Sequence, residues 1–127
     1  MRVLIDTNVL IRALTDPDQL GEEFREWLKS RATTRVVVSD VSLWEIAIKL
    51  SIGKLRLPEG FLALFDDGPF ERLPITADHV WAVRSLPRDG HGDPFDRLLI
   101  CQARLEGLVF ATADRKLEQY GVPILRA

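Results

Sequence analysis

Short apolar runs alternate along the chain with segments in which apolar residues recur every three or four positions. The runs at residues 3–5, 35–38 and 108–111 are bounded by polar residues and rich in Val, Ile and Leu, which is typical of buried strands in a parallel sheet. Two shorter strands are expected at residues 73–75 and 121–125. Helical periodicity predicts helices at about residues 9–14, 19–31, 40–51, 59–67, 76–85, 94–106 and 115–120. This alternation predicts a single α/β domain over residues 1–127, with a parallel sheet covered by helices on both faces.

Polar residues follow three of the expected strands directly. Asp6-Thr7-Asn8 comes after the first strand, Ser39-Asp40 after the second, and Thr112-Ala113-Asp114 after the run at 108–111. In parallel α/β sheets, ligands bind at the carboxyl ends of the strands. Taken singly, each of these polar residues is equally well explained as the cap of the next helix.

Glu45 lies in the middle of the expected helix 40–51, which is apolar nearly all the way round and should therefore be buried. A buried carboxylate without a charged partner is very costly. Its partner is either a metal ion or the ammonium of Lys49, four residues later. The sequence leaves both interpretations open.

Two acids stand at the start of the expected helix 94–106. Asp93 suits the N-cap position and Pro94 the first helical position, so Asp96 is the third residue of the helix. Asp96 is explained either as a capping acid favoured by the helix dipole or as an active-site acid, and spacing does not separate the two. His91, in the preceding loop, is either a phosphate contact or simply an exposed side chain.

Composition narrows the class of protein. The chain is 46% hydrophobic and 28% charged, typical of a globular protein, and its single cysteine excludes an intrachain disulfide and a Cys-rich zinc site. No apolar run reaches the length of a membrane span, so we expect a cytoplasmic protein without membrane contact. With 17 basic and 19 acidic residues the net charge is −2, which is unlike a passive nucleic-acid binder. A polyanionic substrate would require bound cations.

The acidic residues form one site if the strands that precede Asp6 and Asp114 are neighbours. Asp6, Glu45, Asp96 and Asp114 would then converge, and four carboxylates cannot all stay ionised without compensation. Mg²⁺ or Mn²⁺ would provide it, whereas the lack of clustered Cys or His disfavours zinc. Such a site suits metal-assisted hydrolysis of a phosphodiester.

Four segments together resemble PIN-domain ribonucleases, and more narrowly the VapC-type toxins of toxin-antitoxin pairs. The similarity spans nearly the whole chain. The segments are residues 6–10 (DTNVL), residues 44–49 (WEIAIK) with 53–55 (GKL), residues 93–99 (DPFDRLL) and residues 112–114 (TAD).

The resemblance implies a PIN-like three-layer α/β/α sandwich with a mainly parallel sheet of four to five strands. It also implies an Mg²⁺-dependent endoribonuclease, in which Mn²⁺ can substitute, that forms a homodimer and is inhibited by a small cognate antitoxin. Exposed apolar residues on the helices around Trp27 and Phe61 are the expected antitoxin site. By position, the catalytic and metal-binding tetrad falls on Asp6, Glu45, Asp96 and Asp114. Supporting residues would be Asn8, Thr112 and Asp93, and candidate phosphate contacts are Lys49, Arg97 and Arg115, each equally explained as a surface or ion-pairing residue.

Two other classes remain open. A phosphotransfer or phosphatase α/β domain also places acids at strand ends, but a phosphatase with an Asp nucleophile usually has a second Asp at the position of Asn8. In a catalytically silent PIN-like binding module the acids would only cap helices. The melting temperature in Mg²⁺ or Mn²⁺ distinguishes a silent module from a metal site, because only a carboxylate cluster should gain thermal stability from the metal.

Overall fold

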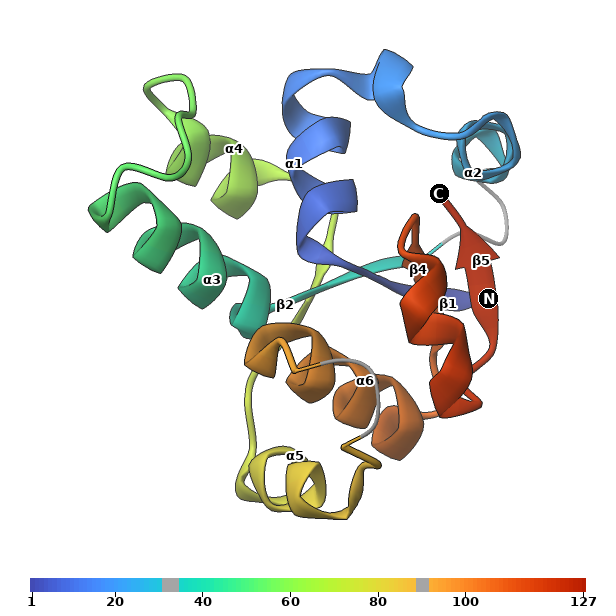
Figure 1. The fold of residues 1–127 in the computed structure, drawn as a ribbon. Coiled ribbons are helices and arrows are strands. Elements are labelled where there is room, and N and C mark those ends of the chain that lie inside the picture. The colour runs from blue at the N-terminus through green and yellow to red at the C-terminus, as the bar shows by residue number, and fades with distance from the viewer. Residues whose placement is uncertain (31–34, 89–91) are drawn as a thin grey trace.

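Five parallel strands form one sheet in the order β3-β2-β1-β4-β5. The computed structural model describes residues 1–30, 35–88 and 92–127 (Figure 1). The strands are β1 (Arg2–Ile5), β2 (Arg35–Ser39), β3 (Glu71–Leu73), β4 (Val109–Thr112) and β5 (Ile124–Arg126). The predicted α/β class and parallel sheet are confirmed.

The helices alternate with these strands along the chain. The α-helices are α1 (Thr7–Thr15), α2 (Glu22–Lys29), α3 (Asp40–Ser51), α4 (Phe61–Asp67), α5 (Ala77–Ala82) and α6 (Pro94–Glu106). Three short 3₁₀ helices are η1 (Pro17–Gln19), η2 (Val83–Ser85) and η3 (Arg115–Tyr120). None of the helices within the described residues is long and apolar enough to cross a bilayer.

Several predicted boundaries were wrong, each for a local reason. The helix expected from residue 19 begins at Glu22, because η1 ends in an extended Leu20. The helix expected from residue 59 begins at Phe61, after Gly60 at φ +83°. The strand expected at 73–75 is instead Glu71–Leu73, the edge strand β3. Pro74 follows it and has no N–H to donate to a ladder.

The core consists of two apolar clusters, one on each face of the sheet, and helices cover both faces in Figure 1. Successive residues of a strand point to opposite faces, so Leu4 of β1 packs with α6 and η3, whereas Val3 and Ile5 pack with α1, α2 and α4. This three-layer arrangement leaves the carboxyl ends of the strands at one edge of the sheet.

The neighbouring pair β1 and β4 positions the candidate site. The register pairs Ile5 with Ala111, and the Asp6 N–H donates to the Ala111 carbonyl at 3.0 Å. The strands that lead to Asp6 and Asp114 are therefore neighbours, which is the condition under which the sequence predicts one acidic site.

Candidate active site

Thr112 joins the acids that follow the two central strands. Its hydroxyl donates to Asp6 Oδ2 at 2.5 Å and accepts the Asp114 N–H at 3.0 Å. Asp6 also caps α1, because its Oδ1 accepts the Val9 N–H at 2.8 Å. Asp114 caps η3 through Lys116. Each of these two carboxylates uses its Oδ1 atom for the cap. The capping and active-site interpretations of these acids are therefore compatible.

The environment of Asp6 opposes its negative charge. The side chain is buried, with only 6% of the residue exposed. Burial raises the pKa of Asp6, hydrogen bonds from Thr112 and Val9 lower it, and the nearby Glu45 carboxylate raises it further. A bound cation would relieve this unfavourable charge.

Glu45 is buried on α3, as its apolar surroundings predicted, with 4% of the residue exposed. Its Oε2 accepts a hydrogen bond from Lys49 Nζ at 2.5 Å, so the predicted ion pair is present. Its Oε1 is buried and has no hydrogen-bond partner among the residues that the structure describes. The ion pair accounts for only half of this carboxylate, and Oε1 is free to coordinate a ligand.

Lys49 connects Glu45 electrostatically with the acids at the start of α6. Its pKa is raised, first by the hydrogen bond to Glu45 and then by the charges of Glu45, Asp93 and Asp96, against the effect of burial. Asp93 Oδ1 accepts the N–H groups of Phe95 and Asp96 at 2.9 and 3.0 Å. Asp93 is therefore the N-cap of α6, as predicted, and Asp96 lies half-buried in its first turn.

The remaining predicted residues that the structure describes lie on α1, η3 and α6. Asn8 is exposed on the first turn of α1, and Arg115 is exposed at the start of η3. Arg97 donates to the carbonyls of Pro87 and Leu86 at 2.7 and 3.1 Å, so it binds the segment that precedes α6. His91 lies outside the described residues.

The donor set fits a hard divalent cation by the chemistry of its atoms, but not by the arrangement of its side chains. Oxygen atoms of Asp6, Glu45 and Asp96 are the type that Mg²⁺ and Mn²⁺ prefer, and the unpartnered Glu45 Oε1 needs a positive partner. Within residues 1–30, 35–88 and 92–127, however, no group of three or more His, Cys, Asp or Glu side chains is arranged to hold a metal. Lys49 supplies the positive charge beside Glu45 in this structure.

The sequence did not predict a buried polar network that joins α5, α6 and the start of α3. His79, to which the sequence assigned no role, is buried, with 1% of the residue accessible. Its ring turns inward because Nδ1 accepts the Thr76 N–H at the start of α5, in a capping box. The signal was available, since Thr76 precedes a polar residue by three positions. Gln102 and Ser39, also buried, complete this network.

Similar structures share this fold over nearly their whole length. A chain of the VapBC2 complex from Rickettsia felis, solved with a promoter DNA fragment, has a TM-score of 0.76 at 14% identity and covers 99% of this chain and 98% of its own. A chain of DNA-bound VapBC from Salmonella typhimurium has a TM-score of 0.72 at 25% identity, with the same coverage. The PIN domain endonuclease Utp24 has a TM-score of 0.59 at 26% identity, covering 99% of this chain and 84% of its own.

The sequence itself carries the family signature. No curated protein matches it significantly. The family model described as "PIN domain" matches residues 3–123. This range includes β2, β3 and β4, all of β1 except Arg2, and all the candidate acids, but not β5. The chain therefore belongs to the PIN domain family.

Proposed function

We propose that this protein is a divalent-metal-dependent endoribonuclease that acts as the toxin of a toxin-antitoxin pair. The observation that carries the proposal is the pair of buried carboxylates, Asp6 and Glu45, at the carboxyl edge of a PIN-fold sheet. Both are costly for the fold without a cation, and Glu45 keeps a buried oxygen without a partner. PIN domains are generally nucleases, and the similar Utp24 is described as an endonuclease.

In this proposal Asp6, Glu45, Asp96 and Asp114 hold Mg²⁺ or Mn²⁺, directly or through water. The metal would supply charge neutralisation and activation of water for attack on a phosphodiester. Thr112 orients Asp6 and Asp114, while Asp93 fixes the first turn of α6 and thus Asp96. Asn8 and Arg115, both exposed beside the site, are available to contact the RNA backbone.

Arg97 and Lys49 are less well placed to contact phosphate. Arg97 already donates to two backbone carbonyls, so it is better explained as a residue that fixes the segment before α6. Lys49 is paired with Glu45 and would contact phosphate only after metal had replaced it there.

The toxin role rests on the likeness to the VapBC chains, whose structures were solved as complexes. We place the antitoxin on α4 and the adjacent α3. The sequence pointed to exposed apolar residues on the helices around Trp27 and Phe61. Trp27 is half-buried and Phe61 is buried, but Leu62 and Leu64 of α4 are exposed, as are Trp44 of α3 and Ile52 just after it. A homodimer and a cytoplasmic location complete the proposal.

Cleavage of RNA tests the activity directly. Purified protein without antitoxin should cleave total RNA with Mg²⁺ or Mn²⁺, stop in EDTA, and leave single-stranded DNA of the same sequence intact. Asp6→Asn keeps the shape but removes the charge, and should lower the rate by about a hundredfold or more. Metal-dependent cleavage at the wild-type rate by this variant would overturn the assignment. Folded protein with no cleavage and no thermal shift in Mn²⁺ would favour the silent binding module.

A further inference from the structure

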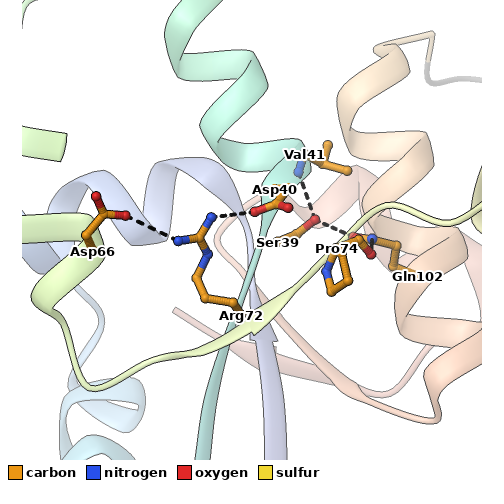
Figure 2. A network of polar contacts seen from close by, with 7 residues as sticks. All are labelled: Ser39, Asp40, Val41, Asp66, Arg72, Pro74 and Gln102. Carbon is orange, nitrogen blue, oxygen red and sulfur yellow. Dashed lines mark hydrogen bonds and ion pairs between the residues drawn. The ribbon is translucent and has the colours of Figure 1, made fainter.

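A chain of hydrogen bonds runs through the interior from α5 to the first turn of α3. Glu106 Oε1 lies 2.8 Å from His79 Nε2, and His79 Nδ1 lies 3.2 Å from Gln102 Nε2. Gln102 Oε1 accepts the Ser39 hydroxyl at 2.5 Å, and Ser39 Oγ accepts the Val41 N–H at 2.9 Å. Figure 2 shows the end of this chain, where Gln102 of α6 meets Ser39.

The direction of each bond in this chain is fixed. A backbone N–H can only donate, so the Thr76 N–H at 3.0 Å makes His79 Nδ1 an acceptor. The ring proton is then on Nε2 and donates to Glu106. The amide nitrogen of Gln102 accordingly donates to His79 Nδ1 and to the Pro74 carbonyl at 3.3 Å, which leaves its oxygen for Ser39. Gln102 therefore has one amide orientation that satisfies all its partners.

This chain links the two helices that carry the candidate acids. Ser39 is the N-cap of α3, which carries Glu45, and Gln102 lies on α6, which carries Asp96. Gln102, Ser39 and His79 are all buried. A buried amide is costly unless its groups are bonded, and an apolar side chain would pack there without that requirement. What the amide adds is a directional connection between the helices.

Two further bonds hold the same turn of α3 from other sides. Thr7 donates to Ser42 at 3.0 Å in the interior, which connects α3 with the first turn of α1. Arg72 of β3 reaches Asp40 at 2.6 Å and also contacts Asp66 of α4 (Figure 2). The contact with Arg72 is exposed, whereas the Gln102 and Thr7 connections are buried and are not weakened by solvent.

We propose that Gln102 is a positioning residue of the active site, which acts through Ser39 to hold α3, and hence Glu45, at a fixed place relative to Asp96. The expected effect on metal binding rests on the proposed metal-dependent function, whereas the positioning of α3 is a property of the fold. Partners one step removed from metal ligands typically change metal affinity about 10- to 100-fold when they are lost.

The test compares Gln102→Met, which keeps the length but loses both hydrogen-bonding groups, with Gln119→Met as a matched control. Gln119 is exposed on η3, where its amide donates to the Lys116 carbonyl. Two readouts are measured well below the melting temperatures: Mn²⁺ affinity by calorimetry, and hydrogen exchange of the amides in α3. For Gln102→Met we expect about tenfold weaker Mn²⁺ binding and faster exchange in α3 with unchanged exchange in β1 and β4. Gln119→Met should match the wild type in both.

Ser39→Ala removes the same bond from the other side together with the N-cap bond to Val41, so its Mn²⁺ affinity, rather than α3 exchange, carries the test if Gln102→Met does not fold. If both variants fold, the double variant should bind Mn²⁺ no more weakly than the single variant of lower affinity. The reason is that both changes break the same hydrogen bond between Ser39 and Gln102. Wild-type affinity and wild-type α3 exchange in Gln102→Met, with only a lower melting temperature, would overturn the proposal. A wild-type protein that binds no Mn²⁺ would overturn the proposed function instead, and the exchange of α3 would still decide whether Gln102 positions it.

Discussion

Thr112 serves two acids with one hydroxyl group. It donates to the buried Asp6 and accepts from the backbone of Asp114. Thr112→Val keeps the shape of the side chain but leaves Asp6 Oδ2 and the Asp114 N–H without this partner. We expect the free energy of unfolding to fall by about 1–3 kcal/mol in urea denaturation. The control is Thr15→Val, because the Thr15 hydroxyl donates to the Ile11 carbonyl at the surface. This change should alter the free energy of unfolding by less than about 0.5 kcal/mol. Equal losses in the two variants would contradict this role for Thr112.

Asp6 should show the opposite effect, since its charge is unfavourable in the metal-free fold. Asp6→Asn keeps an oxygen for the Val9 N–H, and without metal at pH 7 we expect it to be more stable than the wild type by about 1 kcal/mol. Burial raises the pKa of folded Asp6, so the wild-type penalty exists above that pKa and disappears as the pH falls and the carboxyl is protonated. The advantage of the variant should therefore shrink on acidification. Urea denaturation at several pH values with EDTA measures this, and a less stable variant at pH 7 would be the contrary result.

At the scale of the element, the start of α6 separates two roles that spacing left open. Asp93 caps the helix through two backbone N–H groups, so Asp93→Ala should cost about 1 kcal/mol of stability, which Asp93→Ser should largely restore. The side chain that caps α6 is that of Asp93, not that of Asp96. Asp96→Asn should therefore weaken Mn²⁺ binding and leave the cap of α6 intact. Urea denaturation and Mn²⁺ titration of the same samples test both expectations, and interchanged effects would assign the ligand to Asp93.

Elements with strong local signals were predictable from the sequence. The apolar α3 and the Asp93-Pro94 start of α6 have their expected bounds, because capping and periodicity act within a few residues. The adjacency of β1 and β4 was inferred only conditionally. The Ser39-Gln102-His79 network was missed because it joins residues far apart in the chain, and Gln102 lies among apolar neighbours in its helix. Side-chain partners across elements leave no local pattern.

At the scale of the whole molecule, both apolar clusters depend on the same sheet. Leu4 and Val3 of β1 belong to different clusters, so unfolding of the sheet would disrupt both clusters together. We expect a single cooperative unfolding transition, as for most domains of this size. Tryptophan fluorescence and far-ultraviolet circular dichroism should give coincident urea curves. Two separated transitions would contradict the single domain expected over residues 1–127.

The central claim is that Asp6, Glu45, Asp96 and Asp114, which are distant in the chain, together bind one or more hard cations. The most direct measurement is Mn²⁺ binding by calorimetry to the wild type, Asp6→Asn and Glu45→Gln, with the exposed Glu22→Gln as the matched control. The account predicts binding by the wild type and the control, and at least about tenfold weaker binding by the two site variants. Equal affinity in all four proteins, or no binding by the folded wild type, would contradict it.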